Sequence, residues 1–270
     1  MGVHTSEDVF MYYRYDPSIP ACIVFLVLFS VSSIAHIYQL FQTRTWILIP
    51  LAIGGLGEAV AYGLRIVSIN EGPNYSLAIF IAQSNPTLLG PALFAASIYM
   101  CLGRVIIATE GECLSPIRVE WLTKFFVAGD VLGLLVQGAG AILLPMGTLQ
   151  YYYTGSNIII AGLGILVLSF GVFMTTTAVY HFRLLRRPTT ASQDAGLNWR
   201  RELRVLYATS AMVFVRSVYR LVEYSQGNAG WLMTQEWSLY VLDAALMFGV
   251  LLIFNIWYPS IVKIIKEDAF

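Results

Sequence analysis

Charged side chains are scarce in this sequence, and their scarcity indicates a membrane protein. Only 12% of the 270 residues are Asp, Glu, Lys or Arg, about half the share that is typical of soluble domains. Hydrophobic residues make up 57% of the chain, and its mean hydropathy is +0.69. The 16 basic and 16 acidic residues cancel, so no excess of positive charge supports binding to nucleic acid.

Histidine and cysteine are equally rare, and their positions argue against a metal site or a disulfide framework. We expect His4 in a terminal tail and His36 and His181 near the ends of two apolar segments, so they cannot easily form the three-histidine zinc site of an intramembrane hydrolase. The three cysteines form an odd set without metal-ligand spacing. The G-x-S-x-G, Walker and H-E-x-x-H motifs are missing as well. The sequence therefore predicts neither an enzyme nor a cofactor.

Long apolar segments are abundant, and seven of them are long enough to cross a bilayer. A helix needs about 20 apolar residues to span the hydrocarbon core. The first nineteen residues lack the basic region of a cleaved signal peptide, so we expect the first segment to remain as a helix. The sequence predicts an all-α fold, a single seven-helix membrane domain over residues 1–270. The expected spans are roughly 20–41, 46–68, 76–102, 121–146, 157–183, 203–224 and 237–262.

The basic residues predict which side of the membrane each loop faces, because cytosolic loops are enriched in Lys and Arg. The N-terminal segment carries only Arg14, and the loops after the second, fourth and sixth segments carry no basic residue. We therefore expect the N-terminus outside the cell and the C-terminus in the cytosol. The other side holds twelve basic residues: Arg44, Arg104, Arg118, Lys124, Arg183, Arg186, Arg187, Arg200, Arg201, Arg204, Lys263 and Lys266.

Ionisable residues interrupt the sixth and seventh apolar segments at helical spacing. Arg216 and Arg220 are four residues apart, Glu223 follows Arg220 by three, and Glu236 precedes Asp243 by seven. Residues at such spacings lie on one face of a helix. A charge near the middle of a membrane helix costs at least ~2.5–3.5 kcal/mol. We therefore expect these charges to compensate one another inside the bundle.

The predicted orientation brings the polar residues of four spans together in the outer half of the membrane. One interpretation is a polar cavity for an amphipathic molecule, in which carboxylates bind an amine and arginines bind an anionic or hydroxylated head. The other is a set of interhelical ion pairs that fix helix packing, for which the planar guanidinium of arginine is well suited. The candidate ligand-binding residues are Glu58, Arg65, Asp130, Gln137, Arg216, Arg220, Glu223, Glu236 and Asp243.

Proline and glycine near these residues predict local features of the helices. Pro86 and Pro91 lie inside the third segment, where they imply a kink and carbonyl groups that neighbouring helices must satisfy. Several glycines flank Glu58 and Asp130. Small residues of this kind allow membrane helices to approach closely.

Five stretches together resemble the fungal RTA-like lipid-translocating exporters. The stretches are GGLGEAVAYGLR (54–65), LLGPALFAASIYMCLGR (88–104), GDVLGLLVQGAG (129–140), RSVYRLVEYSQG (216–227) and EWSLYVLDAALM (236–247). The resemblance covers nearly the whole chain. It places Pro91, Tyr99, Arg104 and the nine candidate residues on characteristic positions of that family. The sequence departs from the family at Leu166, where a glutamine is expected.

The resemblance implies a plasma-membrane protein that handles lipids without ATP. Members of the family are linked to resistance to 7-aminocholesterol and to sphingoid long-chain bases. The expected partners are therefore membrane lipids or an amphipathic small molecule. The alternative is a seven-helix lipid receptor or sensor, in which a ligand shifts the sixth and seventh helices and the basic loop at 183–204 passes the signal to the cytosol.

Overall fold

Every long element in the described part of the chain is a helix. The computed structural model describes residue 15 and residues 17–72, 76–143, 149–194, 197–227 and 230–258, and no strand occurs among these residues. Six long helices come first: α2 (Ile19–Thr43), α3 (Ile49–Asn70), α4 (Leu77–Ala108), α5 (Val119–Leu143), α6 (Leu149–Arg186) and α7 (Trp199–Ser225). The seventh crossing consists of α9 (Glu236–Leu239), the π-helical turn η4 (Tyr240–Ala244) and α10 (Ala245–Ile256).

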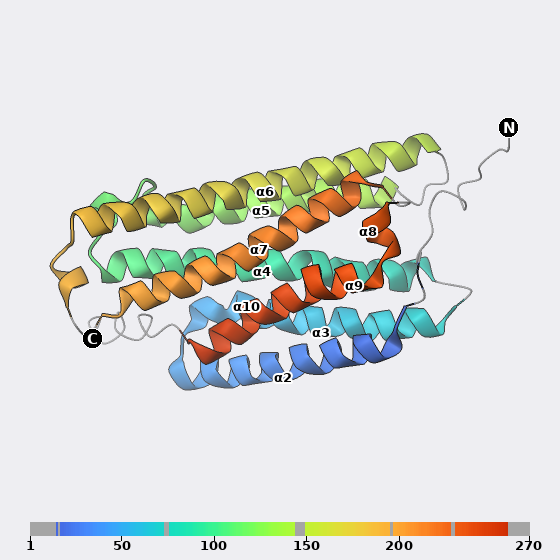
Figure 1. Ribbon diagram of the computed structural model, residues 1–270, viewed down its shortest axis with the longest axis horizontal. Helices are drawn as coiled ribbons and strands as arrows, with labels where there is room; N and C mark the ends of the chain where they lie inside the picture. The colour runs from blue at the N-terminus through green and yellow to red at the C-terminus, as the bar shows by residue number, and fades with distance from the viewer. Residues whose placement is uncertain are drawn as a thin grey trace.

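Short elements connect the long helices. They are the single 3-10 turns η1 (Trp46–Leu48), η2 (Glu112–Leu114) and η3 (Ala191–Gln193), and the one-turn helix α8 (Trp231–Thr234). The long helices run side by side along the long axis of the molecule (Figure 1). Because seven crossings are an odd number, α2 begins at the end of the bundle opposite to the one where α10 ends (Figure 1).

Within the described residues, seven helices are long and apolar enough to cross a membrane, as the sequence predicts. The chain is an integral membrane protein. The third and fifth spans extend further than expected, to Ala108 and to Arg186. The predicted ends of the fourth and seventh spans, 144–146 and 259–262, lie outside the described residues.

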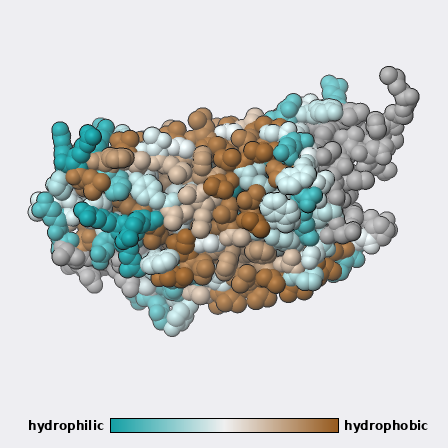
Figure 2. Space-filling model, in the orientation of Figure 1, coloured by the Kyte–Doolittle hydropathy of each residue, from teal (hydrophilic) through white to brown (hydrophobic). Residues whose placement is uncertain are grey.

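The outside of the bundle is apolar, as a lipid-facing surface requires. Val24, Val27, Val31 and Ile34 lie on one exposed face of α2. Figure 2 shows a hydrophobic band around the middle of the molecule, with hydrophilic residues gathered at the end where α6 and α7 meet. No water is available in a bilayer core, so the polar side chains of the spans must find partners inside the bundle.

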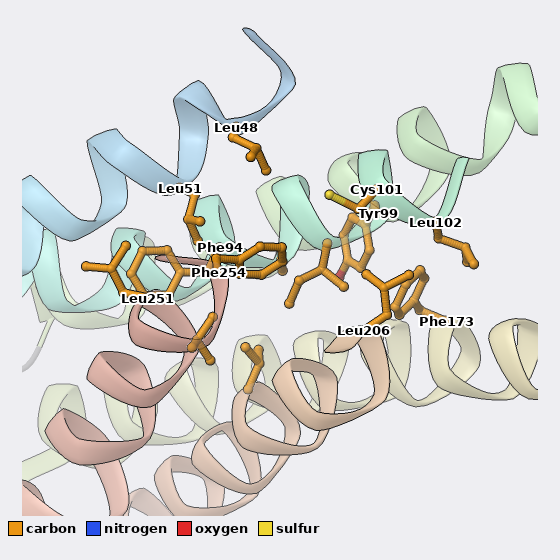
Figure 3. Close-up of a cluster of buried hydrophobic side chains, with 14 of the residues drawn as sticks. Leu48, Leu51, Phe94, Tyr99, Cys101, Leu102, Phe173, Leu206, Leu251 and Phe254 are labelled. Carbon is orange, nitrogen blue, oxygen red and sulfur yellow. The ribbon is translucent and has the colours of Figure 1, made fainter. Parts of the chain in front are cut away.

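Helix α4 lies at the centre of the bundle. In the most apolar 18-residue segment of α4, 67% of the residues are buried, against 28% in the corresponding segments of α2, α5 and α6. Its residues Phe94, Tyr99 and Leu102 are fully buried and pack among side chains from α3, α6, α7 and α10 (Figure 3). The centroid of the Tyr99 ring lies 4.5 Å from that of Phe173 in α6. Helix α4 is therefore in contact with α3 and α10 as well as with α6 and α7 (Figure 3).

Helices α5 and α6 approach each other closely at glycines. A Cβ atom added at Gly140 would lie 2.6 Å from the backbone oxygen of Gly155 in α6. One added at Gly133 would lie 2.7 Å from the side chain of Leu166. The structure thus gives these glycines the packing role that the sequence suggests. Leu166, at the position where the family leads us to expect a glutamine, fills this contact with an apolar side chain.

Candidate functional site

Asp243 lies between two arginines at the centre of the polar site. Arg216 Nε donates a hydrogen bond of 2.5 Å to Oδ1 of Asp243, and Arg220 Nη2 donates to Oδ2. The side chains of Arg216, Arg220 and Asp243 are 6%, 12% and 3% exposed. Each carboxylate oxygen thus has its own guanidinium partner away from water.

Glu223 completes the ion-pair network. Arg220 Nη1 donates to Oε2 of Glu223 over 2.9 Å, and the hydroxyl of Tyr219 donates to Oε1 over 2.8 Å. The network contains two arginines and two carboxylates, so its formal charges balance. A buried ion pair is tolerated when both partners are well bonded, and here every oxygen of the two carboxylates accepts a hydrogen bond.

The spacing on α7 explains why these side chains meet. Arg216, Arg220 and Glu223 occupy successive turns of one helix face, and η4 packs against this face with Asp243. We call the four residues Arg216, Arg220, Glu223 and Asp243 the polar cluster. The sequence expectation that they compensate one another is confirmed.

A proline in α4 supplies a further partner for the polar cluster. Pro91 has no N–H group, so the carbonyl of Thr87, four residues earlier, lacks its usual helical donor. Arg216 Nη2 donates to this carbonyl oxygen over 2.7 Å. Helix α4 continues through Pro86 and Pro91 without interruption. The expectation that a neighbouring helix satisfies a freed carbonyl is therefore confirmed at Thr87.

Glu58 lies beside the polar cluster but forms no ion pair among the described residues. It is 2% exposed, and its Oε1 has no hydrogen-bond partner within the described parts of the chain. Its carboxyl group interacts electrostatically with Asp243, Arg216 and Arg220. A Cβ atom added at Gly90 in α4 would lie 2.6 Å from Oε1. Glycine at position 90 therefore leaves the space that the Glu58 carboxyl occupies.

Glu236 and Asp243 have different partners, although their spacing of seven predicts one shared face. Asp243 lies inside the π-helical turn η4, which takes more residues per turn than an α-helix, so the seven residues from Glu236 to Asp243 no longer complete two turns. Glu236 Oε1 instead accepts hydrogen bonds from Ser18 N over 2.7 Å and from the Tyr240 hydroxyl over 2.9 Å. It connects the start of the seventh crossing to the start of α2.

Asp130 and Gln137 of α5 have their described contacts outside the polar cluster. Asp130 accepts a 2.9 Å hydrogen bond from the hydroxyl of Tyr99. Tyr99 lies twelve residues after Thr87 on α4, which is about 18 Å along a helix axis. Gln137 is buried against Gly162 of α6, and its Nε2 has no partner within the described residues. No ion pair or hydrogen bond among the described residues joins Glu236, Asp130 or Gln137 to the polar cluster, and a role of these three residues in ligand binding stays a prediction.

Arg65 lies two turns beyond Glu58 on α3. Arg65 Nη2 donates to the Tyr15 hydroxyl, and its guanidinium carbon lies 5.9 Å from the centroid of the Tyr15 ring. The buried Tyr62 lies between the two charges, since it interacts electrostatically with both Glu58 and Arg65. Arg65 is therefore near the polar cluster without belonging to its ion pairs.

Three contributors to the site were not among the candidate residues. Tyr219 bridges Glu223 and Ser238, Thr87 supplies a carbonyl, and Gly90 makes room for Glu58. Pro91 was the available signal for Thr87, because the carbonyl that a proline frees always lies four residues before it. Tyr219 directly precedes Arg220 and gives no signal of its own in the sequence.

The chemistry of the site suits binding of charged or hydrogen-bonding groups. Among the described residues, no group of three or more His, Cys, Asp or Glu could hold a metal ion. Arg220 Nε and Glu58 Oε1 are buried polar atoms without partners in the described chain. The N–H group of Arg220 Nε and the oxygen Glu58 Oε1 could thus bind a ligand beside a network whose charges are otherwise balanced.

Comparison with known proteins adds a family and several relatives. Residues 51–265 match the family model described as RTA1 like protein. The chain is 32% identical to Protein RTA1 of Saccharomyces cerevisiae, over 95% of this chain and 87% of that protein. It is 31% identical to Protoporphyrin uptake protein 1 of the same yeast, over 97% of both chains. It is also 24% identical to the Sphingoid long-chain base transporter RSB1, over 90% of this chain and 72% of the yeast protein. No solved structure matches the chain significantly.

Proposed function

The chain belongs to the RTA1-like protein family, and on that premise we propose that it translocates amphipathic lipids across the plasma membrane without ATP. The names of its relatives support this class of cargo, since they include a sphingoid long-chain base transporter. We propose long-chain bases or related lipid amines as substrates. The proposed orientation has the N-terminus outside, as the basic loops predict.

The observation that carries the proposal is the buried polar cluster within apolar spans. A lipid head group is costly to move through hydrocarbon unless polar groups replace its water. The polar cluster together with Glu58 and Arg220 Nε supplies such groups. The head group would pass along these residues while its apolar tail stays in the surrounding lipid.

Reconstitution into liposomes tests the proposal. A long-chain base with a fluorophore on its tail is added to vesicles that contain the purified chain, and a membrane-impermeant quencher reports how much remains in the outer leaflet. We expect faster movement to the inner leaflet than in protein-free vesicles. Saturable binding without faster movement would contradict translocation and favour the receptor alternative. An Arg216→Met/Asp243→Asn double variant is the matched control, because it removes one arginine and one carboxylate together.

A further inference from the structure

Glu58 is an acid that forms no ion pair with any of the described residues. It is 2% exposed, and its Oε1 has no hydrogen-bond partner within the described residues. On the side of α4 it faces Gly90, which offers no side chain. Nothing in its described surroundings therefore neutralises a negative charge at this position by direct contact.

The charges around Glu58 are already balanced without it. The charged or titratable groups that interact with its carboxyl are Asp243 of η4, Arg216 and Arg220 of α7, and Tyr62 of its own helix. Both arginines are bonded to Asp243, and Arg220 is bonded to Glu223 as well. An ionised Glu58 would give this buried site a net negative charge. Buried acids that lack a partner take up a proton instead.

We propose that Glu58 exchanges a proton for the cationic head group of the transported lipid. The inference rests on the proposed function and names its coupling ion. When the site is empty, Glu58 carries the proton, and the site is neutral. When a head group enters, the O–H bond of the carboxyl group breaks, the proton leaves to water, and the carboxylate then pairs with the ammonium group. One positive charge enters and one leaves, so lipid and proton move in opposite directions.

A proton gradient across reconstituted vesicles tests this exchange. The probe is N,N,N-trimethylsphingosine with a fluorophore on its tail, because its fixed charge cannot itself carry a proton. The vesicle lumen is made more acidic than the outside, and potassium with valinomycin holds the membrane potential at zero. One-for-one exchange should enrich the probe in the inner leaflet by up to about tenfold per pH unit. A protonophore should abolish the enrichment.

The outcomes separate this inference from the proposed function. Movement of the probe to the same final distribution with and without the gradient would overturn proton exchange and leave lipid translocation intact. Complete absence of movement with both the trimethylated probe and an ordinary long-chain base would overturn both. A distribution that follows a sodium gradient instead would also overturn the role of the proton.

The Glu58→Gln variant supplies the matched control, because glutamine has the size of a protonated glutamate and cannot ionise. We expect normal abundance and no enrichment of the probe by the gradient. Enrichment equal to that of the unmodified protein would overturn the inference. Infrared difference spectra give a second readout that does not depend on transport. The carboxylic-acid C=O band should be lost when the probe binds, and that change should be missing in Glu58→Gln. A band that persists on binding would contradict the exchange.

Discussion

At the scale of single residues, each arginine of the polar cluster has a defined set of acceptors. Arg220 forms ion pairs with both Asp243 and Glu223. Its replacement by methionine keeps much of the side-chain volume but leaves Glu223 buried with only the hydroxyl of Tyr219 as donor. Removing one partner of a buried ion pair typically costs about 3–5 kcal/mol. We expect Arg220→Met to lower the thermal stability of the protein in detergent and its abundance in the membrane.

The Arg220→Met/Glu223→Gln double variant tests whether charge imbalance is the cause. Glutamine can still accept from the Tyr219 hydroxyl, and the Arg216–Asp243 pair is left in place. Unfolding midpoints of the unmodified, single and double variants should show that the double variant regains most of the loss. If the double variant is no more stable than Arg220→Met, the ion-pair network does not set the stability of this region.

The sequence predicted the ion pairs of the polar cluster better than the position of Glu236. Arg216, Arg220 and Glu223 follow regular α-helical spacing, and regular spacing is readable in a sequence. Asp243 lies inside the π-helical turn η4, which changes the helical spacing between it and Glu236, and no residue type in Tyr240–Ala244 indicates such a turn. The contact of Arg216 with the Thr87 carbonyl depends on where α4 and α7 pack together. These helices are far apart in the sequence, so local sequence patterns do not predict the contact.

At the scale of elements, Gly138 and Gly140 of α5 have opposite surroundings, because Gly140 packs against α6 and Gly138 does not. A Cβ atom at Gly140 would lie 2.6 Å from the oxygen of Gly155, whereas one at Gly138 would meet nothing within 4 Å. Inserting a methyl group into a tightly packed contact costs about 1–3 kcal/mol. We expect Gly140→Ala to lower the unfolding temperature and Gly138→Ala to leave it unchanged or slightly raised. Equal effects of the two substitutions would show that α5 and α6 are not in close contact at Gly140.

The sequence predicted the number of spans but not how deeply each span is buried inside the bundle. Long apolar segments reveal seven crossings because hydrocarbon thickness sets their length. The central place of α4 could not be predicted, since its apolar composition resembles that of the other spans. Asp130 illustrates the consequence: its spacing of seven from Gln137 is correct for a helix, yet its partner is Tyr99 in α4 and not an arginine.

At the scale of the whole molecule, orientation in the membrane is a prediction from twelve basic residues on one side. Single cysteines placed at exposed positions test it, after the exposed Cys113 is replaced by serine. We expect Ser225→Cys, at the last residue of the sixth span, to react with an impermeant maleimide on intact cells. Gln193→Cys, in η3, should react only after permeabilisation. The reverse pattern of labelling would invert the orientation.

We propose above all that a lipid head group occupies the polar cluster beside Glu58. The most direct measurement uses a long-chain base with a photoactivatable diazirine next to its amine and a clickable tail. After irradiation of the reconstituted protein, mass spectrometry identifies the labelled peptides. We expect labels on α3 near Glu58, on α7 near Arg216 and Arg220, and on η4, all reduced by an excess of unlabelled base. Labels confined to lipid-facing residues such as Val24, Val27 and Val31 of α2 would contradict it.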